Sequence, residues 1–197
     1  MTASTITEKR AILRLVKDFT HEYNPSSLGK VIGITRVGTF KALRELEKKG
    51  IVNGKNYGKA RYYTVDLSDD YARKNAEILL MEQSRAYQRW VDEFEGLSEY
   101  AEIIVLFGSM LRDEHKASDV DVLLVYDAKN NKRINEIIRE KDEMLAKRIH
   151  PVKQTKEDLI SNIKKKDEVV LSAIRDGVVI YGFEELLRVI RDVTCKE

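Results

Sequence analysis

Asp119 and Asp121 are separated by one residue at the beginning of an apolar run, and their carboxylates are well suited to bind a metal ion. Residues 118–126 predict a β-strand, in which alternate side chains share a face, so both carboxylates point the same way. Two neighbouring carboxylates repel each other unless a cation relieves the repulsion. Hard oxygen ligands at this spacing suit Mg²⁺ or Mn²⁺, so the pair predicts a divalent cation site.

A second motif, Gly108-Ser109, follows a continuous apolar run at residues 103–107. Such a run predicts a strand buried on both faces. At its end the glycine lets the backbone approach a phosphate, and the amides and hydroxyl at Ser109 can donate to that phosphate where the next helix begins. Taken alone, Asp-x-Asp could merely start a strand with its aspartates in solvent. The buried strand and the Gly-Ser turn before it favour the site.

The Gly108-Ser109 turn followed by residues 118–121 resembles the Gly-Ser…Asp-x-Asp signature of the DNA polymerase beta superfamily, in particular its small archaeal and bacterial members, the minimal nucleotidyltransferases. The resemblance covers residues 98–183, and residues 176–182 resemble the strand that closes the domain. It implies a small mixed sheet with helices on one face and a site for an NTP with Mg²⁺ or Mn²⁺. The implied nucleotide contacts are Gly108, Ser109 and Arg112, and the implied catalytic metal ligands are Asp119 and Asp121.

Active members of this superfamily usually carry a third carboxylate on a later strand, as general base and second metal ligand. The matching stretch, residues 148–154, contains no acid. His150 could serve there as a base or weak ligand or be a structural or surface residue, and Lys153 would oppose a metal. The family also often has a glycine after Arg112, where this chain has Asp113. Two functions therefore stay open: transfer of a nucleoside monophosphate from an NTP to an unknown acceptor, or a transcriptional regulator whose second domain binds a nucleotide or a partner without catalysis.

The elements before this domain form a different pattern. Apolar spacing and capping residues predict three helices and a β-hairpin, at residues 8–19, 27–32, 35–49, 51–53 and 61–65. Ser27 and Thr35 are the predicted caps of the second and third helices, and the third is expected to turn Val37 and Phe40 inward. Three helices followed by a hairpin are the winged helix-turn-helix plan. Residues 33–52 resemble the turn, recognition helix and first wing strand of archaeal and bacterial winged-helix regulators.

Charge supports a double-stranded DNA partner for this segment. Residues 1–66 carry 13 Lys and Arg against 6 Asp and Glu, a net +7, whereas the remaining residues carry 22 against 27, a net −5. A basic segment beside an acidic one indicates two domains, the first with a polyanionic partner. Winged helices also serve as protein-interaction modules, so a protein partner for residues 1–66 remains an open alternative. The predicted DNA contacts are Arg36, Thr39, Lys41 and Arg44 on the third helix and Lys55, Lys59 and Arg61 on the hairpin.

A long connecting helix is predicted between the two domains, from Leu67 to about Gly96, with Ser68 as its cap. Its apolar stripe includes Leu79, Ala86, Trp90 and Phe94 and could cover the following domain or pair with a second copy in a homodimer. A Trp and a Phe on such a stripe are more often core residues than cofactor contacts.

The whole chain is thus predicted to be α+β, with a winged-helix domain at residues 1–66, a connecting helix at 67–97 and a nucleotidyltransferase-like mixed sheet with helices at 98–197. The chain has 197 residues, of which 43% are hydrophobic, so it can bury a core. Its longest apolar runs are far shorter than the roughly 20 residues of a membrane span. Its single cysteine, Cys195, cannot form an internal disulfide, and the cytoplasm is the expected compartment.

Overall fold

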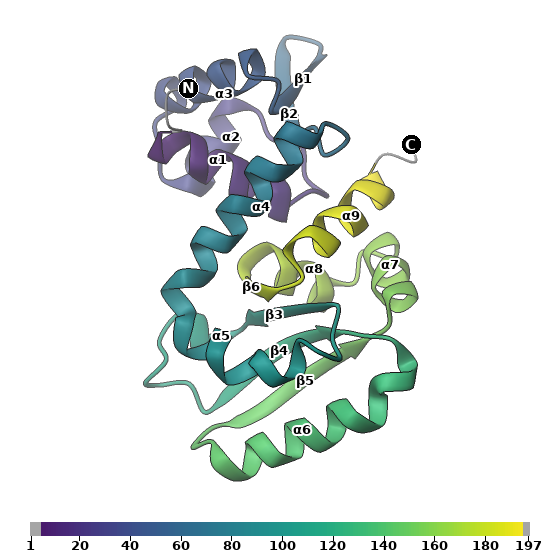
Figure 1. The fold of residues 1–197 in the computed structure, drawn as a ribbon. Helices are drawn as coiled ribbons and strands as arrows, with labels where there is room; N and C mark the ends of the chain where they lie inside the picture. The colour runs from purple at the N-terminus through teal and green to yellow at the C-terminus, as the bar shows by residue number, and fades with distance from the viewer. Residues whose placement is uncertain (1–4, 195–197) are drawn as a thin grey trace. The chain divides into compact units, whose positions relative to one another are not determined.

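The computed structural model describes residues 5–194, which divide into two compact units (Figure 1). One unit contains the residues up to 79 together with those from 190 onward, and the other contains residues 80–189. Cys195 lies outside the described residues. Within residues 5–194, no helix is both long and apolar enough to cross a membrane.

The first unit opens with the three predicted helices, α1 (Ile6–Lys17), α2 (Pro25–Ile32) and α3 (Arg36–Lys48). Their shared core is apolar and solvent-excluded, since Ile12, Leu28, Leu43 and Leu46 are fully buried. Burial of several such side chains, each contributing about 1.5–3 kcal/mol, holds the three helices together.

Side-chain caps fix where the helices begin. Thr35 caps α3 as predicted, because its Oγ1 accepts a hydrogen bond from the Gly38 amide at 3.2 Å. The predicted cap of α2 is wrong. Asn24 caps this helix and accepts from the Ser26 and Ser27 amides at 2.9 Å, while Ser27 completes the capping box. Pro25 is the reason for the earlier start, because its fixed φ suits the first helical position.

The inward stripe of α3 differs from the predicted one. Val37 and Phe40 are 63% and 47% exposed, whereas Thr39 is fully buried and faces the core with Ala42. Two contacts explain this rotation. The Thr39 hydroxyl donates to the Thr35 carbonyl at 3.0 Å, so its burial leaves no unsatisfied group. Gly29 in α2 lies so close to Thr39 that a Cβ there would be 2.9 Å from its Oγ1.

A β-hairpin follows α3. Strand β1 (Val52–Tyr57) pairs antiparallel with β2 (Ala60–Val65), and Tyr63 also bridges to Tyr23. The strands extend farther than predicted because the chain reverses only at Gly58, whose φ of 59° is easy for glycine. Together, the three helices, the hairpin and the bridge from Tyr23 to Tyr63 form a winged helix-turn-helix fold. The winged-helix prediction from the sequence is confirmed.

The segment after the hairpin is helical but is not one helix. Helix α4 (Asp70–Ser84) is followed by a 3₁₀ turn at Arg85–Tyr87, α5 (Gln88–Phe94) and a second 3₁₀ turn at Glu95–Leu97. The break follows Ser84, whose hydroxyl donates to the Met81 carbonyl at 2.8 Å, a contact that bends helices. Asp69, rather than the predicted Ser68, caps α4 and accepts from the Ala72 amide at 2.9 Å.

The second unit is built on a mixed four-stranded sheet. In order across the sheet, the strands are β5 (Arg148–Gln154), β4 (Asp119–Val125), β3 (Ile103–Phe107) and β6 (Val178–Tyr181). Strand β3 pairs antiparallel with both β4 and β6, whereas β4 and β5 are parallel. The buried strands at 103–107 and 119–125 confirm the prediction made from the two apolar runs.

Helices cover both faces of this sheet, which corrects the expectation of one covered face. On one face, side chains of α5 and α6 (Asn131–Met144) form a core with alternate residues of the strands. On the other, α7 (Lys156–Lys164) contacts β5 and α8 (Glu168–Asp176) contacts β3. Figure 1 shows α6 on one side of the sheet and α7 and α8 on the opposite side. Helix α9 (Phe183–Thr194) follows β6.

Both covered faces follow from burial. Strands β3 and β4 have buried apolar side chains pointing each way, and an open face would leave half of them in water. At the beginning of β4, Asp119 and Asp121 are intermediate in exposure, whereas the other residues of this strand are buried.

Candidate metal and nucleotide site

Asp119 and Asp121 lie at the beginning of β4, on the same face of the sheet, as predicted. Their side chains are 27% and 28% exposed. The strand register places Phe107, the last residue of β3, opposite Asp121. The Gly-Ser turn that follows β3 is therefore brought to the two carboxylates.

His150 completes a cluster with these aspartates. In the parallel pairing of β4 and β5 it lies opposite Asp121, and its Nδ1 is 3.3 Å from Asp119 Oδ2 and 4.0 Å from Asp121 Oδ1. One ligand atom from each of the three residues lies within 4.8 Å of the others. The sequence left open whether His150 was a ligand or a surface residue. Its side chain is 54% exposed, and the parallel register also places it beside both carboxylates.

The carboxylates disturb each other as like charges should. The pKa of Asp121 is raised, first by burial and then by the negative charge of Asp119, while His150 acts in the opposite direction. A raised pKa means that the ionised pair is held at a cost, which a bound cation would remove. Two carboxylate oxygens and an imidazole nitrogen are a donor set that fits a divalent metal ion.

Gly108 is required where β3 turns toward the carboxylates. Its φ is 82°, and a Cβ at this position would overlap the Oδ2 of Asp121. The next residues form a single 3₁₀ turn, Ser109–Leu111, rather than the expected α-helix. The turn is closed by the amides of Arg112 and Asp113, which both donate to the Ser109 carbonyl.

Replacing Gly108 with alanine is expected to displace Asp121. A Cβ would collide with its carboxylate, and the backbone conformation at φ 82° and ψ −154° is essentially restricted to glycine and costs other residues about 1–3 kcal/mol. We expect a modest fall in thermal stability and at least about a tenfold loss of metal-dependent NTP affinity, the factor that corresponds to about 1.4 kcal/mol. Calorimetric titration would measure it. Gly96→Ala is the control, because nothing lies within 4 Å of a Cβ there. Unchanged metal-dependent affinity in Gly108→Ala would contradict this role.

The remaining predicted residues of the second unit fall in different places. The Arg112 side chain is exposed. Asp113, found where the family often has glycine, pairs with Lys116 at 3.0 Å. Lys153 does not oppose a metal, which corrects the expectation. It lies opposite Leu124 in the register, on the face away from the carboxylates, and donates to Asn135 of α6.

On the first unit, the exposed face of α3 carries Arg36, Lys41 and Arg44 as predicted. The structure gives none of these three an ion-pair partner among residues 5–194. Thr39 is not on this face, because its side chain is fully buried, so the predicted contact with DNA is not available to it. The cause is the rotation of the inward stripe of α3.

The hairpin residues also differ from one another. Lys55 and Lys59 are exposed, and the Lys55 Nζ lies 5.0 Å from the centre of the Tyr57 ring. Arg61 instead forms an ion pair with Glu47 of α3, and its guanidinium lies 5.8 Å from the centre of the Tyr63 ring. Arg61 therefore joins the hairpin to α3 and is less available to a partner than the two lysines.

One family model matches most of the second unit. The model of the family described as Polymerase beta, Nucleotidyltransferase matches residues 95–185. No curated protein matches the chain.

Similar solved structures include adhesin competence repressor (AdcR) from Streptococcus pyogenes, at 12% identity over 71% of this chain and 81% of that chain, with a TM-score of 0.37. Another is ZitR from Lactococcus lactis, described as a zinc-responsive MarR family member, at 11% identity over 73% of this chain and 77% of that chain, with a TM-score of 0.35. Likenesses this slight carry no conclusion about this chain.

Proposed function

We propose that this chain transfers a nucleoside monophosphate from an NTP to an acceptor, which the match of residues 95–185 to the polymerase beta nucleotidyltransferase family supports, and that its first unit binds double-stranded DNA. The observation that carries the proposal is the cluster of Asp119, Asp121 and His150 beside the Gly108-Ser109 turn. Such a cluster combines metal ligands with a backbone turn that can face a triphosphate.

In this proposal Asp119, Asp121 and His150 hold the divalent cation. When bound, the cation neutralises triphosphate charge and stabilises the leaving pyrophosphate. Ser109 donates from its amide and hydroxyl to the triphosphate, and exposed Arg112 pairs with a phosphate oxygen. Mg²⁺ and Mn²⁺ both accept carboxylates, but imidazole suits transition metals better, so we expect Mn²⁺ to bind more tightly than Mg²⁺.

The proposed reaction is a substitution at the α-phosphorus of the NTP. An acceptor hydroxyl oxygen bonds to the α-phosphorus, the bond from that phosphorus to the bridging oxygen of the β-phosphate breaks, and pyrophosphate leaves. The hydroxyl proton passes to solvent. The chain's own residues contribute by orienting the triphosphate, which is how most catalysis of this kind is achieved.

The position of a label tests this reaction. The full chain is incubated with Mn²⁺ or Mg²⁺ and each NTP in turn, labelled at the α- or the γ-phosphate, with a cell extract as the source of acceptor. We expect α-label in a product larger than the nucleotide and γ-label only in pyrophosphate. The Asp119→Asn, Asp121→Asn double variant is the control and should give no labelled product beyond that formed by the extract alone. A γ-labelled product that forms only when the parent protein is added would contradict nucleotidyl transfer.

A second function is favoured by one observation, the lack of any acid on β5. The nucleotidyltransferase-like domain would then bind a nucleotide or a partner without turnover, and the chain would be a transcriptional regulator. The same incubation separates the two functions. Retention of labelled NTP on the protein with no labelled product supports the regulator.

The DNA-binding role rests on the first unit alone. Exposed cations occupy α3 (Arg36, Lys41 and Arg44) and the hairpin (Lys55 and Lys59), the two elements with which winged helices contact a groove and its flanking phosphates. The net charge of +7 over residues 1–66 supports the same partner. DNA and NTP as partners agree with the cytoplasmic location expected from the sequence.

We also expect the protein to be a homodimer. Helix α4 exposes Tyr71, Ile78 and Met81 at 47%, 55% and 47%, and their spacing places them on one helical face. Leu79, by contrast, is only 6% exposed, so its substitution would test folding rather than assembly. A dimer pairs two winged helices, as two half-sites on DNA require.

Light scattering tests this expectation. The mass at micromolar concentration should be near twice the 22.8 kDa of one chain, and Ile78→Glu should lower it toward one chain. Val31→Glu is the matched control, because Val31 is an apolar residue on α2 with 48% exposure. A mass near 23 kDa for the parent protein would refute the dimer.

A further inference from the structure

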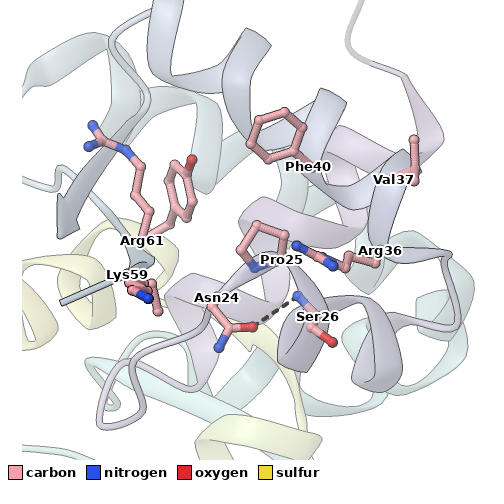
Figure 2. Close-up of a pocket in the computed structure, with 10 residues that line it drawn as sticks. Asn24, Pro25, Ser26, Arg36, Val37, Phe40, Lys59 and Arg61 are labelled. Atoms are coloured by element: carbon pink, nitrogen blue, oxygen red, sulfur yellow. Dashed lines mark hydrogen bonds between the residues drawn. The ribbon is translucent and has the colours of Figure 1, made fainter. Parts of the chain in front are cut away.

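A cavity of about 520 Å³ opens on the first unit between α2, α3 and the hairpin. Its lining combines apolar and cationic side chains, including Pro25, Val37, Phe40, Arg36, Lys59 and Arg61. Figure 2 shows Val37 and Phe40 on α3, Arg36 beside Pro25, and Lys59 and Arg61 on the hairpin at the other side of the cavity. The cavity therefore lies on the surface through which DNA binding is proposed.

The apolar part of this lining is unusual for its position. Val37 and Phe40 are 63% and 47% exposed, at the N-terminal half of the recognition helix and between the cations Arg36 and Lys41 in sequence. Apolar spacing predicts that both side chains face the core, but in the structure Thr39 and Ala42 face the core instead. Water thus contacts two large apolar side chains on a face that otherwise carries positive charge.

Charge and polarity together restrict what can cover this face. Arg36 and Lys59 favour an anionic partner, whereas Val37 and Phe40 favour an apolar group within a few ångströms of those anions. In the major groove of DNA the bases present hydrogen-bonding groups, and the apolar group among them is the C5-methyl of thymine. Phosphates flank every base, so thymine in a duplex meets both requirements.

We propose that Val37 and Phe40 recognise thymine by packing against its C5-methyl group, while Lys59 contacts a neighbouring phosphate. This inference rests on the proposed DNA-binding function and specifies its target as duplex DNA with thymine at the contacted positions. Hydrogen bonds from Arg36 and Arg44 to base edges select among neighbouring bases, and the apolar pair selects for the methyl group.

Substitution of uracil for thymine tests the proposal, since uracil differs from thymine only by the missing methyl group. Preferred sites are first selected from random duplexes with the full chain and are then resynthesised with uracil at every thymine position. Binding of the two duplexes is compared at one salt concentration. The parent protein should bind the uracil duplex at least about fourfold more weakly, the factor that corresponds to burying one apolar carbon.

The variants assign this difference to the two side chains. The Val37→Ala, Phe40→Ala double variant should bind both duplexes equally, at about the affinity of the parent for the uracil duplex. Both residues are largely exposed, and an unchanged unfolding temperature would verify the fold. Val31→Ala, an exposed apolar residue on α2, is the control and should keep the preference for thymine.

Two negative results are distinct. Equal affinity of the parent protein for the thymine and uracil duplexes would overturn the recognition of thymine while leaving DNA binding intact. The same conclusion follows if the double variant keeps the full preference. No binding to any duplex at low salt would overturn the proposed DNA-binding function itself, and this inference with it.

Discussion

Raising the salt concentration from 50 to 200 mM is expected to weaken binding of the full chain to duplex DNA by about a thousandfold. Each phosphate that a cation neutralises releases counterions, and six such contacts give a loss of about that size. The chain offers about six suitable cations at this surface: Arg36, Lys41, Arg44, Lys55, Lys59 and, through its partly exposed guanidinium, Arg61. Mobility shift or fluorescence anisotropy across the salt range measures the slope.

Two variants separate the contribution of phosphate contacts to this affinity from that of base contacts. Lys59→Ala removes a phosphate contact on the hairpin and should weaken all sequences alike, lowering the slope by about 1. Arg36→Ala removes a side chain near base edges and should relax sequence preference by about 1–3 kcal/mol. Lys164→Ala, an exposed lysine in the second unit, should change neither. A folded protein that shifts no duplex at low salt would rule out the DNA-binding role.

The second large effect concerns the NTP. Without a divalent cation, Asp119 and Asp121 face the negative triphosphate directly, so NTP affinity should fall by at least about 100-fold on chelation. That factor corresponds to about 2.7 kcal/mol, within the range for unit charges at short distance near a protein surface. Calorimetric titration with Mg²⁺, with Mn²⁺ and with a chelator measures the difference. Equal NTP affinity in all three conditions would contradict the proposed site.

Removing the charges without changing shape isolates their role. The Asp119→Asn, Asp121→Asn double variant should bind the NTP equally with and without metal, because the cation has lost its ligands and the triphosphate has lost its repulsion. The carboxylate of Asp113 lies in the loop before β4 and pairs with Lys116. Asp113→Asn is therefore the matched control and should keep the metal dependence of the parent.

The elements that hold the candidate site could be predicted from the sequence. The apolar runs at 103–107 and 119–125 and the stretch at 148–154 are strands in the structure. For the first two the reason is local, because a short run of β-branched and large apolar residues bounded by turn residues is typical of a buried strand, whereas the stretch at 148–154 was expected from the family resemblance. Gly108 and the two aspartates were found in the same way, by their positions at the ends of these runs.

The third member of the cluster could not be found locally. His150 lies 29 positions after Asp121, and only the parallel pairing of β4 and β5 brings the two side chains together. Strand order and register depend on tertiary packing, which the residues around His150 do not reveal. The same register sends Lys153 to the other face of the sheet, where it donates to Asn135.

Side-chain orientation in α3 was missed for a related reason. Apolar periodicity predicts that Val37 and Phe40 are buried, but a threonine and an alanine fill that place because α2 and α3 pack closely at Gly29. Apolar periodicity does not predict a buried threonine, because it counts threonine as polar. In the structure the Thr39 hydroxyl donates to the backbone of its own helix, so it can be buried. The predicted contact of Thr39 with DNA is wrong for this reason, because the side chain is buried.

The central claim is that Asp119, Asp121 and His150 form one divalent cation site, and binding of Mn²⁺ to the full chain tests it most directly. Free Mn²⁺ gives a strong paramagnetic resonance signal that broadens on binding, so the ions bound can be counted without any nucleotide. The parent should bind Mn²⁺, and the double asparagine variant should not bind it. His150→Ala should bind Mn²⁺ at least about 10-fold more weakly, because loss of a ligand costs no less than loss of a group that only orients one. Equal Mn²⁺ binding by the parent and the double asparagine variant would contradict the claim.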